Sequence, residues 1–316
     1  MSSGVIKPKI IFFGNEQIAT GVATEAPVLS MLIDEGYDVK MVIVNQTKLS
    51  SGTTKSLAVQ KIARNNNIPF YTPLKLSELH DDIAGSGSAI GVLVAFGQMV
   101  PQSIIDLFPL GIVNIHPSEL PKHRGPTPIE SVMLNGETTT AVSLMQLSQK
   151  MDAGPIYAQS EPIEVSGQTK QVLADELLEL GKSMLKTILP MILSDKCTAL
   201  PQEDSFATYD KTIKKQDGVM DFSKTAIQLE REVRAYATWP KSRMVIGGLD
   251  VVVTQTSLAN ENEITEAKRQ NGDVFAHNKQ LYVRTSKDYL IIERLKPAGK
   301  QEMTAEAFLA GYGQRL

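Results

Sequence analysis

Short apolar runs alternate with segments of helical spacing along the first part of the chain. The runs typical of buried strands are residues 9–14, 39–44, 90–95 and 111–115. Helices are expected between them, from the residues after Gly14 to Gly36, near 56–66 and near 103–107. This alternation is typical of a mostly parallel sheet covered by helices, so we predict an α/β, Rossmann-like domain.

The same domain is predicted to end in a long helix. Residues 140–147 and 156–165 have the pattern of two further strands, and residues 169–193 then place apolar side chains at helical spacing. We expect this apolar stripe to lie in the core, with Pro190 bending or ending the last turn. The stripe comprises Val172, Leu173, Leu177, Leu178, Leu180, Leu185, Ile188 and Leu189.

A polar segment containing a proline separates this region from a second pattern. We interpret residues 195–208 as a linker between a catalytic domain of residues 1–194 and a second domain of residues 209–316. The second domain is expected to begin with a helix near 225–235 and to continue with short strands. These strands are predicted within 243–253, where a turn at Gly247-Gly248 makes a hairpin, and at 280–285 and 289–295. Short strands with glycine turns indicate a small β-barrel or sandwich.

Composition excludes several classes of protein. A chain of 316 residues suits two domains, and no apolar run approaches the about 18 residues that span a bilayer. The residues after Met1 lack the apolar core of a signal peptide, so we expect a cytoplasmic protein with no membrane partner. A single cysteine, Cys197, cannot form an internal disulfide, and four scattered histidines predict no metal site. The motif Gly-x-Gly-x-x-Gly is absent after the first strand, which disfavours a dehydrogenase.

Charge is unevenly distributed along the chain. The net charge is −3, but residues 207–316 hold 17 Lys and Arg against 14 Asp and Glu. The preceding residues hold 15 against 21, so the first part is net −6 and the last part net +3. A basic domain that follows an acidic one suggests a polyanionic partner.

Candidate chemistry is concentrated in the stretch Asn114-Ile-His-Pro-Ser-Glu-Leu-Pro-Lys-His-Arg-Gly125 and in Asp152. Asn114 and His116 are two residues apart at a strand end, so their side chains are expected to point the same way. An imidazole can take a proton from an attacking amine, an amide can bind the oxygen of a tetrahedral intermediate, and a carboxylate can orient the imidazole. Taken singly, each residue type is more often structural than catalytic. Together they suit acyl transfer to nitrogen.

This block resembles the folate-dependent formyltransferases, whose hallmarks are Asn-x-His, Ser-Leu-Leu-Pro, Arg-Gly and Asp-x-Gly in this order. The resemblance implies that Asn114, His116 and Asp152 are catalytic and that the formyl donor is 10-formyltetrahydrofolate. It also implies folate contacts by Ser118, Glu119, Leu120 and Pro121, and by Phe96, Gly97, Gln98 and Met99. Glu119 replaces a leucine of the family pattern, and its charge would oppose an anionic folate tail unless it faces solvent.

The second half resembles the C-terminal domain of the methionyl-tRNA formyltransferases, an OB-like β-barrel. The matching segments are Asp221-Phe-Ser, Gln228-Leu-Glu-Arg231, Arg234-Ala-Tyr, Trp239-Pro-Lys-Ser242 and Lys296-Pro-Ala-Gly-Lys300. The resemblance implies formylation of the α-amine of initiator methionyl-tRNA. Lys48 and Lys55 stand where the family loop has basic residues, so they are expected to contact tRNA phosphates; the alternative is a solvated loop that makes no such contact. We also expect a monomer. The alternatives are another amine acceptor, such as an amino sugar on a nucleotide, release of formate to water, or a nucleic-acid-binding protein without activity.

Overall fold

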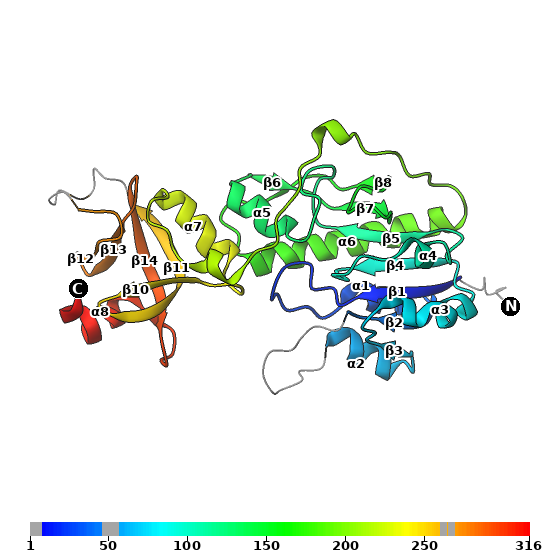
Figure 1. Ribbon diagram of the computed structural model, residues 1–316, viewed down its shortest axis with the longest axis horizontal. Coiled ribbons are helices and arrows are strands. Elements are labelled where there is room, and N and C mark those ends of the chain that lie inside the picture. Colours follow the sequence, from blue (N-terminus) through cyan, green and yellow to red (C-terminus); the bar gives the residue numbers. More distant parts are fainter. Residues whose placement is uncertain (1–7, 46–56, 260–263, 265–268) are drawn as a thin grey trace. The chain divides into compact units, whose positions relative to one another are not determined.

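The computed structural model describes residues 8–45, 57–259, 264 and 269–316 of the chain. It divides into two compact units, each with its own sheet (Figure 1). The first unit comprises residues 1–129, 138–164 and 171–211, and the second comprises residues 130–137, 165–170 and 212–316. No described helix is long and apolar enough to cross a membrane. The domain boundaries predicted at 194 and 209 stay a prediction.

The first unit is built on a seven-stranded sheet of order β3-β2-β1-β4-β5-β7-β8. Five neighbouring strands are parallel, and β7 and β8 are antiparallel additions at one edge. The strands are β1 Lys9–Gly14, β2 Asp38–Ile43, β3 Phe70–Tyr71, β4 Ile90–Val94, β5 Ile112–His116, β7 Ser143–Gln146 and β8 Ile156–Gln159. The predicted Rossmann-like, mostly parallel sheet is confirmed.

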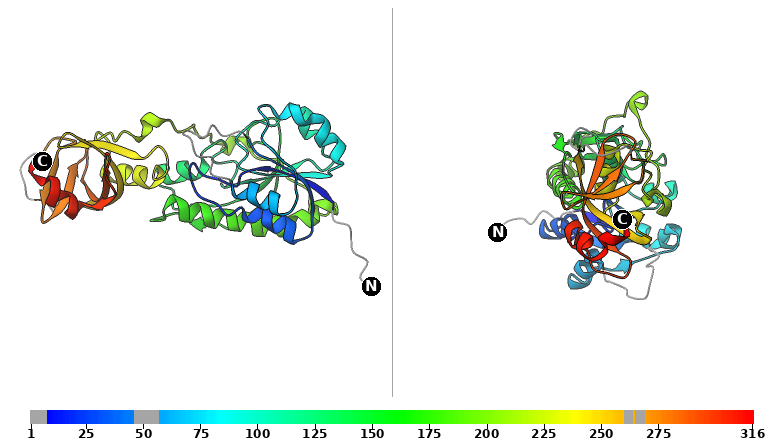
Figure 2. Two further views of the ribbon diagram at one scale, coloured as in Figure 1. Left: turned by 90° about the horizontal axis from the view of Figure 1, so that it is seen from below. Right: turned by 90° about the vertical axis from the view of Figure 1, so that its left-hand side faces the viewer.

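Helices lie on both faces of this sheet (Figure 2). Helices α3 and α4 pack on one face, where Phe13 of β1 makes edge-to-face contacts with Phe96 and Phe108. Helix α6 packs on the other face, where Gly181 lies so close to Ile115 of β5 that a side chain would clash. The helices are α1 Pro27–Asp34, α2 Ala58–Asn65, α3 His80–Ser86, α4 Gln102–Ile105 and α6 Lys170–Leu193, with a 3-10 turn at Leu76–Leu79.

Several predicted elements differ from the structure. The helix expected after Gly14 begins only at Pro27, because Ala26 has a left-handed backbone (φ 56°) and residues 15–26 form a loop. The two strands expected at 140–147 and 156–165 are each broken, which leaves the short pair β6 Thr139–Thr140 and β9 Ile163–Glu164. The long helix continues through Pro190 to Leu193. Val172 of its apolar stripe is exposed rather than buried.

The second unit contains an antiparallel sheet of order β10-β11-β14-β13-β12, with β15 paired to β14. Thr225 caps helix α7 by accepting from the Gln228 backbone N–H, and Gly247 and Gly248, both with positive φ, turn the predicted hairpin. The elements are α5 Pro128–Asn135, α7 Ala226–Ala235, β10 Ser242–Ile246, β11 Leu249–Ala259, β12 Val274–His277, β13 Gln280–Arg284, β14 Tyr289–Pro297, β15 Met303–Thr304 and α8 Ala305–Tyr312. The prediction of a separate antiparallel β domain is confirmed.

The core of the second unit forms where the sheet packs against α7 and α8. The side chains of this core occur at every second position of a strand, as Met244 and Ile246 of β10 and Leu281 and Val283 of β13 show, which places them on one face of the sheet. The largest contributors are Leu229, Val233, Ile246, Val253, Leu281, Leu290, Ile292, Leu295 and Phe308.

Candidate active site

A cavity of about 370 Å³ opens at the carboxyl ends of β1, β4 and β5. The chain leaves β1 for β2 on one side of the sheet, while β4 and β5 lie on the other side. Parallel α/β sheets bind ligands where the strand order reverses in this way. Asn114, His116 and Asp152 all line this cavity, although Asp152 is 36 residues beyond His116 in sequence.

The imidazole of His116 is held in one orientation. Its Nε2 lies 2.9 Å from the carbonyl oxygen of His123, which can only accept a hydrogen bond, so Nε2 carries the proton. In the neutral ring, Nδ1 therefore keeps its lone pair, and Nδ1 lies 3.8 Å from Asp152 Oδ1. The His116 side chain is only 5% exposed. The arrangement leaves one basic nitrogen directed toward the carboxylate and the cavity.

Asp152 is fixed by its backbone as well as by its side chain. Its Oδ2 accepts a 2.8 Å hydrogen bond from the Gly125 backbone N–H, and its φ is 48°. Position 154 requires a glycine, because a Cβ atom there would lie 1.9 Å from the carbonyl oxygen of Gln146. The Asp-x-Gly spacing therefore allows the loop to approach the end of β7 closely and directs the carboxylate toward His116.

The Asn114 side chain completes the polar part of the cavity. Asn114 precedes His116 by two residues on β5, so both side chains project from the same face of the sheet. Among the described residues, none forms a hydrogen bond with the Asn114 amide, although the residue is only 6% exposed. A buried amide without a protein partner can donate to a bound ligand.

Family models match nearly the whole chain. A model described as formyl transferase matches residues 9–189, and one described as formyl transferase, C-terminal domain, matches residues 212–313. The chain belongs to the formyl transferase family. This assignment agrees with the resemblance read from the sequence motifs.

Individual relatives match at full length. The chain is 33% identical to the methionyl-tRNA formyltransferase of Chloroflexus aggregans over 311 residues, which cover 96% of this chain and 97% of the relative. It is 31% identical to the enzyme of the same name from Chloroflexus aurantiacus, with 96% of each chain covered. Among solved structures, an N-formyltransferase from Helicobacter canadensis in complex with folinic acid and dTDP-3-aminofucose superposes with a TM-score of 0.65. It shares 18% identity, with 94% of this chain and all of that chain covered, so it shows the fold alone.

The residues predicted to contact folate fall into two groups in this formyl transferase. Phe96, Gly97, Gln98 and Met99 line the cavity, as expected for a loop that follows β4. The segment 118–121 does not line it, because its polar groups are used to hold the loop. Ser118 Oγ donates to the Lys122 carbonyl oxygen, and Ser143 Oγ bonds both the Ser118 carbonyl oxygen and the Leu120 N–H.

The other residues of that segment are also absent from the cavity lining. Glu119 is exposed and pairs with Lys122 at 3.1 Å, so its carboxylate faces solvent rather than a buried ligand. Pro121 is half-buried and accepts a backbone hydrogen bond from Thr208. Folate contact by Ser118, Glu119, Leu120 and Pro121 stays a prediction that the lining of this cavity does not support.

The cavity also contains residues that the sequence analysis missed. Gln17, Ile18, Ala19 and Thr20 line it from the loop after β1, and Leu147, Ser148 and Met151 line it from the loop before Asp152. The residues after Gly14 could have been expected at the site, because Gly14 ends a parallel strand and the carboxyl ends of such strands lie at one edge of the sheet. The sequence analysis instead assigned these residues to a helix.

Two further predictions concern charged residues. Lys48 and Lys55, proposed to contact tRNA, lie outside the described residues. Arg124 precedes the cavity residue Gly125 but is itself only 1% exposed. Its guanidinium is hydrogen-bonded to the side chains of Gln202, Asp204 and Tyr209. Among the described residues, no cluster of His, Cys, Asp or Glu could hold a metal ion.

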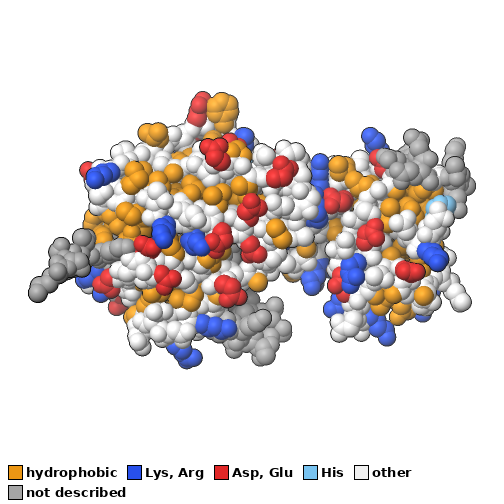
Figure 3. Space-filling view, turned by 180° about the vertical axis from the view of Figure 1, so that it is seen from behind, with side chains coloured by type: hydrophobic (Ala, Val, Ile, Leu, Met, Phe, Trp, Pro, Cys, Tyr) orange, Lys and Arg blue, Asp and Glu red, His pale blue; other side chains and the backbone are white. Residues whose placement is uncertain are grey.

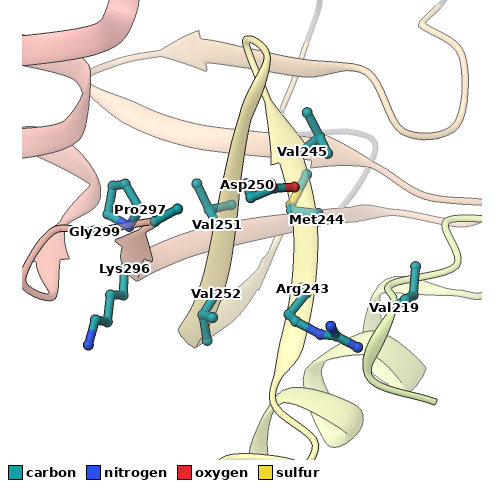
Figure 4. Close-up of a pocket in the computed structure, with 11 residues that line it drawn as sticks. Val219, Arg243, Met244, Val245, Asp250, Val251, Val252, Lys296, Pro297 and Gly299 are labelled. Atoms are coloured by element: carbon teal, nitrogen blue, oxygen red, sulfur yellow. The ribbon is translucent and has the colours of Figure 1, made fainter. Parts of the chain in front are cut away.

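A second cavity of about 480 Å³ lies in the antiparallel unit (Figure 4). Strands β10, β11 and β14 line it mainly with apolar side chains, together with the cationic Arg243 and Lys296 and the anionic Asp250. Arg243 extends toward Val219, and its Nη2 donates to the Lys215 carbonyl oxygen at 2.6 Å. The buried Nε of Arg243 meets no acceptor among the described residues. This cavity therefore offers cationic groups beside an apolar surface.

Proposed function

We propose that this chain transfers the formyl group of 10-formyltetrahydrofolate to the α-amine of methionyl-tRNA. The observation that carries the proposal is the arrangement of Asn114, His116 and Asp152 around one cavity, in a chain that matches methionyl-tRNA formyltransferases at full length. The amine attacks the formyl carbon of the donor, and the bond between that carbon and N10 of the folate then breaks. Tetrahydrofolate leaves with N10 protonated by the proton taken from the amine. The residues of this chain would bind it, position the amine and accept its proton.

His116 is the base in this proposal. Because Nε2 is engaged with the His123 carbonyl oxygen, the proton of the amine would go to Nδ1. The Asp152 carboxylate at 3.8 Å would stabilise the imidazolium that results. Asp152 remains an acceptor for the Gly125 N–H throughout, so its orientation does not depend on the protonation of His116.

Asn114 is the donor to the formyl oxygen. Negative charge develops on this oxygen when the amine attacks, and a buried amide N–H stabilises that charge more than it stabilises the neutral carbonyl. Removal of one such donor typically costs about 3 kcal/mol of transition-state stabilisation. Asn114 is only 6% exposed, and a hydrogen bond at such a buried position is electrostatically stronger than one in bulk water.

The cavity suits the ring system of a folate. Its volume is within the range of small-molecule sites, and Ile18, Phe96 and Met99 give it apolar walls. The amides of Gln17 and Gln98 also line it, and the Gln98 Nε2 donates to Asn45 at 2.6 Å. Flat heteroaromatic rings need such apolar faces and amide partners at their edges.

The tRNA would be bound by the second unit. Lys and Arg side chains occur at several places on its surface, with Asp and Glu between them (Figure 3). Arg243 and Lys296 beside the second cavity are suitable phosphate contacts, because their charged groups lie next to apolar surface on which a ribose or base can rest.

A formyl-transfer assay with a panel of acceptors tests the proposal. Wild-type protein is supplied with labelled 10-formyltetrahydrofolate and, in parallel, with charged initiator methionyl-tRNA, other aminoacyl-tRNAs and dTDP-linked amino sugars. We expect the label to appear mainly on initiator methionyl-tRNA. Preferential formylation of an amino-sugar nucleotide, or release of formate alone, would overturn the proposed acceptor.

A further inference from the structure

Residues 200–210 are hydrogen-bonded to the loop that contains Arg124, which follows His116 in sequence, and to the loop that contains Asp152. We call these residues the strap; it belongs wholly to the first unit. At one end, Leu200 and Ile156 exchange two backbone hydrogen bonds of 2.8 and 2.9 Å. At the other end, Arg124 N donates to the Thr208 carbonyl oxygen and Asp210 N donates to the Arg124 carbonyl oxygen. A segment predicted to be a linker is therefore part of the scaffold of the active site.

The side chain of Gln202 joins the two catalytic loops directly. Its Nε2 donates to the carbonyl oxygens of Asp152 and Gly154 at 2.8 and 2.7 Å. Its Oε1 accepts from Nε and Nη2 of Arg124 at 3.0 and 2.8 Å. Both amide hydrogens and the amide oxygen are thus used. A carboxylate of the same length could bind Arg124 but could not donate to the two carbonyl groups.

Arg124 lies between the two residues whose backbone groups bind His116 and Asp152. The residue before it, His123, supplies the carbonyl oxygen that fixes His116 Nε2, and the residue after it, Gly125, supplies the N–H that fixes Asp152 Oδ2. A shift of Arg124 would therefore move both bonds at once.

The strap holds the Arg124 loop at further points. Arg124 Nη2 and Nη1 donate to Asp204 and to the Tyr209 hydroxyl at 2.7 and 2.8 Å. His123 Nδ1 lies 3.0 Å from Asp210 Oδ1, and both side chains are buried. The His123 N–H also donates to Thr208 Oγ1 at 2.8 Å. These contacts restrict the movement of the loop that contains Arg124 relative to the strap.

We propose that Gln202 is a positioning residue for formyl transfer, and that the strap sets the separation of Asp152 from His116. The proposal rests on the proposed function of the His116 site. Neither Gln202 nor Arg124 lines the cavity, so their effect on the reaction would pass through the pair they hold. A displacement of about 1 Å in a catalytic group can cost about 100-fold in rate.

The test compares Gln202→Glu and Gln202→Ala with Ser205→Ala, a control on the same strap whose hydroxyl donates to the exposed Glu203. For each variant, kcat, the KM for the formyl donor, the melting temperature and the ¹⁵N chemical shifts of the His116 side chain are measured. We expect Gln202→Glu to lower kcat by at least about tenfold with little change in KM, since the donor cavity is intact. The His116 shifts should change in both Gln202 variants and not in Ser205→Ala.

Two results would overturn the proposal. One is a parental kcat with unchanged His116 shifts in both Gln202 variants. The other is a lower melting temperature with an unchanged kcat per folded molecule, which would make Gln202 merely structural. Failure of the wild-type protein to formylate any acceptor would instead refute the proposed function, and the His116 shifts would still test the strap.

Discussion

Glu16 is a buried carboxyl group whose ionisation should be visible in the stability of the protein. It lies in the loop after β1, next to cavity residue Gln17, and is completely buried. Its two oxygens accept hydrogen bonds from the Val28 and Leu29 N–H groups at the start of α1. Burial nevertheless raises the pKa of Glu16 from 4.5 to about 7, with a smaller contribution from Glu179 of α6 and opposition from the α1 hydrogen bonds and Lys182.

The sign and size of the effect follow from this pKa. A folded-state pKa above the unfolded value means that the folded protein binds an extra proton between pH 4.5 and about 7. The stabilisation from protonated Glu16 is complete below pH 4.5 and is lost as the pH rises through about 7. At 1.36 kcal/mol per pH unit, the difference corresponds to about 3 kcal/mol, most of which is lost between pH 5 and 8.

A glutamine at this position would remain neutral at every pH, so Glu16→Gln removes this loss. Urea unfolding of the two proteins at pH 5 and 8 is followed by far-UV circular dichroism, because the single Trp239 lies in the second unit and reports that unit. From pH 5 to pH 8, the unfolding free energy of the first unit should fall by about 2 to 3 kcal/mol more in the parent than in Glu16→Gln. Glu161→Gln, which changes an exposed glutamate, is the control. Parallel pH dependences for parent and Glu16→Gln would refute the reasoning.

Three other changes test separate parts of the structure. Lys170→Met should destabilise the second unit by about 3 kcal/mol, because it leaves the buried Glu130 without its ion-pair partner. An unchanged midpoint of urea unfolding would contradict this. Gly154→Ala should lower kcat and stability together, because the new Cβ would meet the Gln146 carbonyl oxygen; parental activity would show that the loop can move. Affinity for initiator tRNA should decrease as the salt concentration rises if the basic second unit binds phosphates. Filter binding at about 50 to about 300 mM salt measures this dependence. A constant affinity would exclude an electrostatic contact.

The catalytic candidates could be predicted because short-range geometry and motif order determine them. Alternation on a strand places Asn114 and His116 on one face, and the family spacing pointed to Asp152, which the structure brings to 3.8 Å from His116. The parallel sheet, α6 and the Gly247-Gly248 hairpin also follow from local patterns. Whether these residues catalyse the reaction stays a prediction.

The remaining features depend on tertiary contacts that no local pattern reveals. The sequence of the strap shows no helical or strand pattern of apolar residues. Its polar side chains instead bind Arg124 and backbone carbonyl groups that are far away in sequence. Nothing in the local pattern indicated that Ser118 would turn inward to hold its own loop while Glu119 faced solvent. The loop at 15–26 was mistaken for helix because no local pattern shows that Glu16 is buried there and accepts hydrogen bonds from the first turn of α1.

Single-turnover transfer from labelled 10-formyltetrahydrofolate to charged initiator methionyl-tRNA tests the central claim most directly. The parent is compared with Asn114→Ala, His116→Ala and Asp152→Asn under saturating folate, with folate binding measured for each protein. We expect each substitution to lower the transfer rate by about 100-fold or more while folate binding persists, since the three side chains act on the reacting groups. A parental transfer rate in His116→Ala would contradict the account, because no other described side chain has been assigned to accept the proton of the amine.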